Sequence, residues 1–147
     1  MSIKEQLNEN MKAAMKARDN LRLSAVRMII SAIKNREIDS RAELDDKAVI
    51  DVMSTLAKQR RESIRLYREG GRIDLVEKEE AELAVLLEFL PAQLSEEELA
   101  ELIERVIMET GAAGAKDMGR VMKALTALTA GKADGKIVSE AVKQRLA

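Results

Sequence analysis

The stretch LEFLPAQLSEEELAELIERVI, residues 87–107, decides how this chain folds. It contains the only proline, Pro91, which ends the helical pattern before it because proline has no backbone N–H. Shortly afterwards Ser95 begins an S-x-x-E pattern with Glu98, a capping box that starts a new helix. A helix end, a short linker and a helix start in quick succession predict a domain boundary. We therefore expect an N-terminal helical domain, residues 1–92, and a C-terminal domain, residues 93–147.

The composition of the 147-residue chain predicts an all-α protein. Apolar residues make up 46%, charged residues 35% and aromatic residues only 1%. Good helix formers dominate, and runs of β-branched or aromatic residues that would build strands are few. Apolar side chains recur at helical spacing in seven segments, at about residues 3–15, 21–38, 45–69, 73–90, 96–110, 118–128 and 137–146. The predicted inward-facing residues include Met15, Leu128 and Ile137.

Two missing residue types limit the chemistry of this chain. It has no cysteine and no histidine, which excludes disulfides, thiolate zinc sites, imidazole metal ligands and Ser-His or Cys-His catalysis. We expect no metal site, no cofactor and no catalytic residue. No apolar run approaches the length of a membrane span, so no membrane contact is expected. The first residues resemble neither a signal peptide nor a transit peptide, which predicts a cytoplasmic protein.

Charge is unevenly distributed along the chain. The net charge is −1, but residues 73–110 carry −10 and residues 111–147 carry +4. The basic stretch MGRVMKALTALTAGKADGKIVSEAVKQRLA, residues 118–147, reads as two amphipathic helices joined by a turn. A basic helical hairpin behind an acidic segment is a candidate for contact with a phosphate-bearing partner.

The turn of this hairpin, GKADGK at residues 131–136, has two interpretations. It lacks the spacing of a phosphate-binding loop and follows no strand, so nucleotide binding is not expected. Gly131 can end one helix and Asp134 can cap the next. Lys132 and Lys136 beside the N–H groups of a helix start also suit a phosphate.

Two other charged clusters have structural interpretations. The glutamates Glu77, Glu79, Glu80 and Glu82 are expected on the solvent side of their helix, not around a metal. The arginines Arg60, Arg61, Arg65 and Arg68 crowd the end of the third helix. A structural role, in which these arginines pair with glutamates at helical spacing, is at least as well supported by the sequence as a role in ligand binding.

Three motifs together resemble the YqeY family, over the whole chain. They are LRLSAVRMIISAIKNREID at residues 21–39, GGRIDLVEKEEAELAVLLEFLPAQLSEEEL at 70–99, and GRVMKAL…GKADGK at 119–136. This family is related to the tail domain of GatB, the B subunit of the glutamine-dependent aspartyl/glutamyl-tRNA amidotransferase. The resemblance implies an N-terminal helical domain and a C-terminal three-helix domain of GatB/YqeY type.

The resemblance also implies a function and a set of residues. In GatB the tail reaches toward the transfer RNA, while the chemistry lies in another domain. By analogy Arg120, Lys123, Lys132 and Lys136 would face RNA. This chain departs from its relatives at residues 126–130, where they often carry a proline and extra lysines and this chain reads TALTA.

Three functions remain open at this point. The first is a non-catalytic helical module that binds tRNA or another structured RNA. The second is a protein–protein interaction adaptor with no RNA role, whose acidic stretch docks a basic partner. The third is the carbon–nitrogen ligase with glutamine as amido-N-donor that the family association suggests, which we do not expect of this chain alone because it shows no activated nucleophile. The sequence leaves the oligomeric state open.

Overall fold

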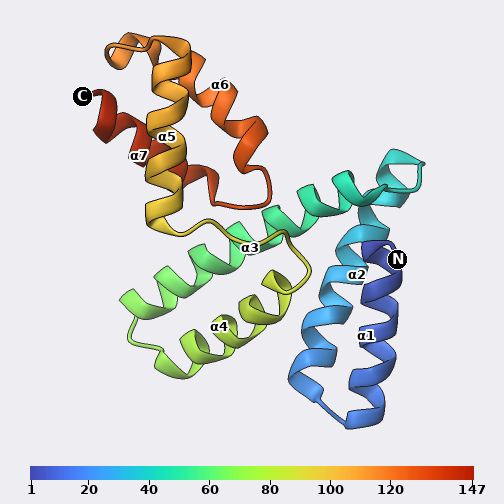
Figure 1. Ribbon diagram of the computed structural model, residues 1–147. Coiled ribbons are helices and arrows are strands. Elements are labelled where there is room, and N and C mark those ends of the chain that lie inside the picture. The colour runs from blue at the N-terminus through green and yellow to red at the C-terminus, as the bar shows by residue number, and fades with distance from the viewer. The chain divides into compact units, whose positions relative to one another are not determined.

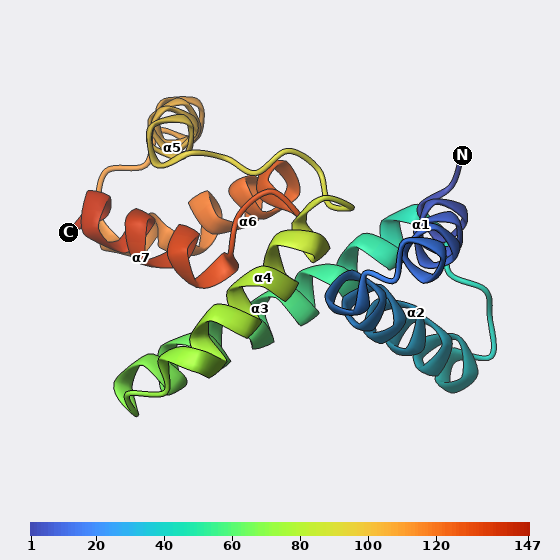
Figure 2. The same ribbon diagram turned by 90° about the horizontal axis from the view of Figure 1, so that it is seen from below.

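Helices account for all the regular structure of the chain. The computed structural model describes residues 1–147 and contains seven α-helices, one short 3₁₀ turn and no strand, which confirms the all-α class. Figures 1 and 2 show the elements in chain order from two directions. The chain divides into two compact units, Met1–Pro91 and Ala92–Ala147. None of the helices combines the length and the hydropathy that crossing a bilayer requires.

The N-terminal unit consists of two antiparallel helical hairpins. α1 pairs with α2, and α3 pairs with α4, as both ribbon views show. The bounds are α1 Ile3–Ala17, α2 Asn20–Ser40, α3 Asp46–Glu69 and α4 Ile73–Leu87. Ser2 and Glu5 form a capping box at the start of α1, and Asp45 caps α3 by accepting from the Ala48 N–H. Short polar residues just before the apolar patterns of α1 and α3 therefore set where these two helices begin.

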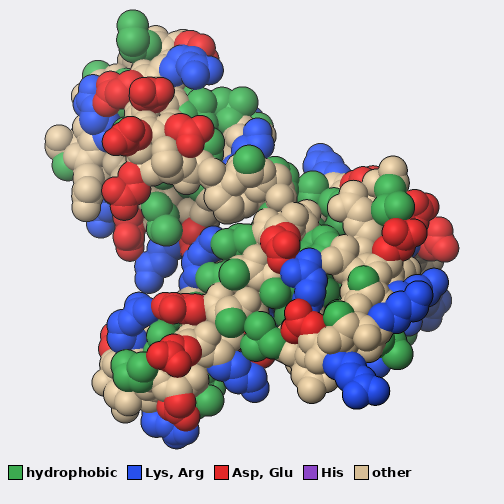
Figure 3. All heavy atoms as spheres, turned by 60° about the horizontal axis from the view of Figure 1, so that its bottom comes forward, with side chains coloured by type: hydrophobic (Ala, Val, Ile, Leu, Met, Phe, Trp, Pro, Cys, Tyr) green, Lys and Arg blue, Asp and Glu red, His purple; other side chains and the backbone are tan.

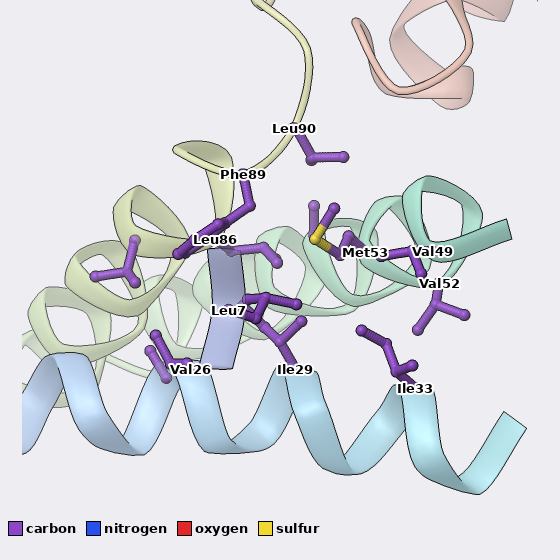
Figure 4. Packing of buried hydrophobic residues seen from close by; sticks show 13 residues of the cluster. Leu7, Val26, Ile29, Ile33, Val49, Val52, Met53, Leu86, Phe89 and Leu90 are labelled. Carbon is purple, nitrogen blue, oxygen red and sulfur yellow. The ribbon is translucent and has the colours of Figure 1, made fainter. Parts of the chain in front are cut away.

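All four helices contribute to one hydrophobic core in this unit. Leu7 of α1, Ile29 of α2, Met53 of α3 and Leu86 of α4 are almost completely buried. In Figure 4 the α2 side chains point up toward Leu7 and Met53, and Leu86 and Phe89 close the cluster from above. Burial of each such side chain is worth about 1.5–3 kcal/mol. This core fixes how the two hairpins pack.

The C-terminal unit is a three-helix arrangement around a core of its own. Its elements are α5 Glu96–Thr110, the 3₁₀ turn Ala115–Asp117, α6 Met118–Thr129 and α7 Gly135–Leu146. The predicted capping box of Ser95 and Glu98 is present at the start of α5. The buried residues are Leu99, Ile103, Val106, Ile107, Val121, Leu125, Val138, Val142 and Leu146. The assignment of this unit as a separate domain of GatB/YqeY type stays a prediction.

Three residues predicted to face inward are half exposed. They are Met15, Leu128 and Ile137. On α6 the buried position next to Leu128 is taken by Thr129, whose hydroxyl donates to the Leu125 carbonyl oxygen and so can be buried without an unmet hydrogen bond. α4 also ends at Leu87, three residues earlier than predicted, although Leu90 is still buried. The apolar pattern of the sequence continues past the end of α4 because residues after the helix, such as Leu90, are also part of the hydrophobic core.

The prediction that Glu82 lies on the solvent side of α4 is wrong. Its side chain is only 5% exposed and pairs with Arg60 of α3, which is 10% exposed. Arg60 also pairs with Glu79 at 3.0 Å. The face of α4 that packs against α3 includes both glutamates, so an arginine from α3 compensates their charge. This ion pair joins the two helices of the second hairpin.

Candidate nucleic-acid interface

The six residues Gly131–Lys136, here called the basic turn, link α6 to α7. α6 ends at Thr129, and Gly131 adopts a φ of 75°, in the left-handed region that favours glycine. The backbone N–H of Lys132 donates to the Thr129 carbonyl oxygen at 2.8 Å. The helix stop predicted at Gly131 is therefore confirmed.

The linker before α5 holds the basic turn in place. The backbone N–H of Leu94 donates to the Lys132 carbonyl oxygen at 2.8 Å, and the Gln93 side-chain amide donates to the Gly131 carbonyl oxygen at 2.7 Å. Sequence reasoning did not find these contacts, because residues 93 and 131 are far apart in the chain and no local pattern links them. The two bonds fix the turn's backbone, while the side chains of Lys132 and Lys136 remain exposed.

Asp134 occupies the start of α7. Its carboxylate accepts from the Lys136 N–H at 2.8 Å, which confirms the predicted cap. An anion is thus already present where the helix N–H groups converge, and a phosphate at the same place would be repelled. The ammonium groups of Lys132 and Lys136 are the groups at this turn that can face an external anion.

Arg120 and Lys123 lie three residues apart near the start of α6, and both are exposed. Arg120 pairs with Asp117 at 3.1 Å. Backbone N–H groups of Ala113 and Gly114, together with the nearby positive charges, hold the pKa of Asp117 below its usual value. Asp117 is therefore ionised at neutral pH and positions Arg120, while Lys123 makes no ion pair.

The structure groups the four candidate residues as two pairs. Arg120 and Lys123 lie on one stretch of α6, and Lys132 and Lys136 lie on the basic turn beyond its other end. The helix rises about 14 Å from Arg120 to its end at Thr129, and about 9 Å from Lys123 to the same residue. A ligand that engages both pairs in full must therefore extend along α6.

The arginines of α3 are engaged in ion pairs. Arg65 pairs with Glu62 and Glu69, and Arg68 pairs with Glu80 of α4 at 2.7 Å. Arg60 pairs with Glu79 and Glu82, as described above. In Figure 3 basic and acidic side chains accordingly alternate over the surface of the α3–α4 hairpin. The structural interpretation of this cluster is confirmed for these three arginines.

Comparison with known proteins identifies relatives of the chain. A family model described as Yqey-like protein matches residues 4–146. The chain is 40% identical to a protein named "Altered inheritance of mitochondria protein 41, mitochondrial" from Eremothecium gossypii, over 70% of this chain and 58% of that protein. It is also 40% identical to the protein of the same name from Kluyveromyces lactis, over 67% of this chain and 55% of the relative.

The Saccharomyces cerevisiae protein of this name is more distant. It is 35% identical over 57% of this chain and 46% of the relative. The chain spans about half the length of the curated relatives it matches. The structure therefore corresponds only to the matched part of those longer proteins.

The predicted cytoplasmic location is contradicted by this comparison. The relatives of known name are called mitochondrial proteins, so the expectation of a cytoplasmic protein is not supported by them. The prediction was drawn from the residues around α1, and these are shaped by a capping box and a packed helix face.

Proposed function

Because the chain belongs to the Yqey-like protein family, we propose that it is a non-catalytic helical module that binds structured RNA, with tRNA as the class of RNA. The proposal places it beside the glutamine-dependent tRNA amidotransferases, whose B subunit has a related tail. The observation that carries the proposal is the basic turn, a backbone fixed by hydrogen bonds from Gln93 and Leu94 that presents two lysines without ion pairs. Arg120 and Lys123 extend the positive surface along α6.

The spacing of the two cation pairs favours a polyanion over a small phosphate compound. Along α6, Lys123 and Arg120 lie about 9 and 14 Å from the helix end that precedes the basic turn, which favours a ligand longer than one phosphate group. A nucleic-acid backbone offers charges at short intervals along its whole length and could reach both pairs. The net charge of +4 over residues 111–147 has the sign that such a ligand requires.

Recognition in this proposal depends on shape and backbone, not on base sequence. The C-terminal unit contains no aromatic side chain on which a base could stack. Phe89 is buried in the N-terminal unit, and Tyr67 lies half-buried on α3. Lysine and arginine contacts to phosphates position a ligand without reading its sequence. We therefore expect similar affinities for tRNAs of different sequence.

Filter binding of the purified chain to bulk tRNA tests this proposal. If three to four phosphates are neutralised, log K should fall with log[salt] with a slope of about −2 to −4. Substitution of Lys132→Glu and Lys136→Glu together should reduce the affinity by at least about tenfold at low salt. Absence of binding at low salt and micromolar protein would exclude the RNA role.

A matched control separates a local contact from a change in net charge. Lys12 and Lys16 are exposed on α1 and make no ion pair. The double substitution Lys12→Glu and Lys16→Glu changes the net charge by the same amount as the substitutions in the basic turn. It should leave tRNA affinity within about twofold of the original protein. Equal losses in the two double variants would contradict a site at the basic turn.

The carbon–nitrogen ligase activity associated with the family needs its own test. Release of ammonia from glutamine requires a nucleophile and an activating base, and the chain has neither cysteine nor histidine for these roles. We expect no glutamine-dependent conversion of misacylated tRNA by the purified chain. Turnover without any other subunit would overturn the non-catalytic part of the proposal.

A further inference from the structure

A groove runs between α5 and α7 on the C-terminal unit. Its volume is about 400 Å³, and it is partly open to solvent. The apolar residues that line it are Leu99, Ala100, Ile103, Ile137 and Ala141. From Glu96 to Glu104 along α5, the lining spans about 12 Å, or roughly two helical turns.

Small side chains leave this groove unfilled. Ala100 on α5 and Ala141 on α7 present only methyl groups toward it. Ile137, one of the residues expected in the core, is instead 52% exposed beside the groove. An isoleucine that is half exposed beside an open apolar groove offers surface for a partner to bury.

The rim of the groove is acidic. It carries Glu96, Glu104 and Glu140 against a single cation, Arg145, and Arg145 is already bound to Glu104. Glu96 and Glu140 are exposed and make no ion pair. Two carboxylates without an ion pair therefore lie beside an apolar floor, and this combination favours a ligand that is apolar in the middle and positive at its edges.

We propose that the α5–α7 groove binds one amphipathic helix of a partner protein, with an apolar stripe that enters the groove and lysines or arginines that flank the stripe. A helix presents anchors at i, i+4 and i+7 over about 10 Å, which matches the two turns of the groove. The lining residues lie on helices and offer no sheet edge, so a partner strand has no backbone to pair with. The groove adjoins the basic turn, since Lys136 directly precedes Ile137 on α7, but the glutamates of its rim disfavour a phosphate in the groove itself.

The test uses the full chain and two fluorescent synthetic helical peptides of about 18 residues, or five turns. Both carry leucines at i, i+4 and i+7. One has lysines flanking the stripe, and the other has glutamates at the same positions. Fluorescence anisotropy should show the lysine peptide binding at least about tenfold more tightly than the glutamate peptide.

Two half-exposed aliphatic residues provide a matched pair of variants. Ile137, beside the groove, is 52% exposed, and Leu128 on α6, away from it, is 46% exposed. Ile137→Ser should weaken binding of the lysine peptide by about tenfold, and Leu128→Ser should change it by less than about twofold. Neither substitution should alter tRNA binding, so failure of this inference is distinguishable from failure of the RNA proposal.

A charge-reversal variant tests the rim independently of the floor. Glu96→Lys together with Glu140→Lys changes two exposed side chains and should invert the preference in favour of the glutamate peptide. Equal affinity for the two peptides, equal effects of Ile137→Ser and Leu128→Ser, or no binding at about 100 µM peptide would each overturn the inference.

Discussion

The α3–α4 hairpin and the basic turn use positive charge in opposite ways. The end of α3 has the densest run of arginines in the chain, yet Arg60, Arg65 and Arg68 are all bound to glutamates. The basic turn has only Lys132 and Lys136, and both are exposed without an ion pair. The number of cations in a segment is therefore a poor guide to the positive charge that it offers a ligand.

The choice of arginine in the hairpin and lysine in the basic turn fits this difference in the use of positive charge. Arginine has a planar group that binds carboxylates through two hydrogen bonds, which suits the fixed contacts between α3 and α4. Lysine carries a single charge on a flexible stem, which suits contact with phosphates whose positions vary. The comparison predicts that substitution of the buried Arg60 in the hairpin will alter stability, and that lysine substitutions in the turn will alter binding.

The largest expected effect is on stability, at Arg60. Arg60→Met removes the cation that compensates Glu82, whose side chain is 5% exposed. A buried carboxylate without its partner costs about 3 kcal/mol, measurable as a loss of unfolding free energy in urea. If this variant were as stable as the original protein, the distinction between the hairpin and the turn would fail.

Two further variants sharpen this measurement. Arg65→Met removes an arginine that is half exposed, and its ion pairs are open to solvent, so no clear change in stability is expected. Combining Arg60→Met with Glu82→Leu replaces the buried pair by apolar side chains and should restore most of the stability lost in Arg60→Met.

The next effect in size concerns binding. Lys132→Gln with Lys136→Gln should make the salt dependence of tRNA binding shallower by about 1.5–2 in the slope of log K against log[salt]. Arg65→Gln with Arg68→Gln removes the same number of charges from the hairpin and should leave the slope unchanged. A shallower slope in the arginine variant would show that the hairpin also offers free positive charge.

A smaller effect tests whether the backbone of the turn matters. Gly131→Ala places a side chain at a φ of 75° and should cost about 1 kcal/mol of stability. Gly119→Ala, in the first turn of α6, meets no atom within 4 Å and should stabilise by about 0.5 kcal/mol. Thermal unfolding of the two variants should therefore shift in opposite directions.

The smallest effect is a dependence on pH in the N-terminal unit. Glu37 accepts from the Lys4 ammonium at 2.8 Å and from the Leu44 N–H at 2.9 Å, and these contacts lower its pKa below the ordinary value of 4.5. Because the folded pKa is the lower one, this stabilisation is present above about pH 4.5 and is lost as the pH falls through the folded pKa.

The variant Glu37→Gln measures this contribution. The difference in melting temperature between the original protein and the variant should be largest near neutral pH and should shrink below about pH 4.5. A difference that stays constant down to low pH would show that the carboxylate charge is not what matters at this position.

Much of the fold followed from local sequence signals. The capping boxes at Ser2 and Ser95 and the helix stop at Gly131 act within a few residues, so their positions could be predicted. The burial of Glu82 could not be predicted in this way, because its partner Arg60 lies 22 residues earlier on a different helix. Periodicity gives the apolar face of a helix, but it does not show which charged residues at the edge of that face meet a partner.

The candidate interface was predictable only in part. Charge and the family resemblance indicated Lys132 and Lys136, and the structure adds that Asp134 already occupies the helix start between them. The exposure of Ile137 depends on the small side chains of Ala100 and Ala141 around the groove. Contacts of this kind arise from packing between helices and leave no short pattern in the sequence.

The bond from the Leu94 N–H to the Lys132 carbonyl oxygen gives the protein an internal reporter. Leu94 lies outside every helix, where a backbone amide would ordinarily exchange its hydrogen with solvent quickly. Its exchange should be slow, and its rate should measure how often the loop that carries Lys132 detaches from the segment before α5. Anything that binds and steadies the loop should slow this one amide, which makes it a label-free probe of ligand binding.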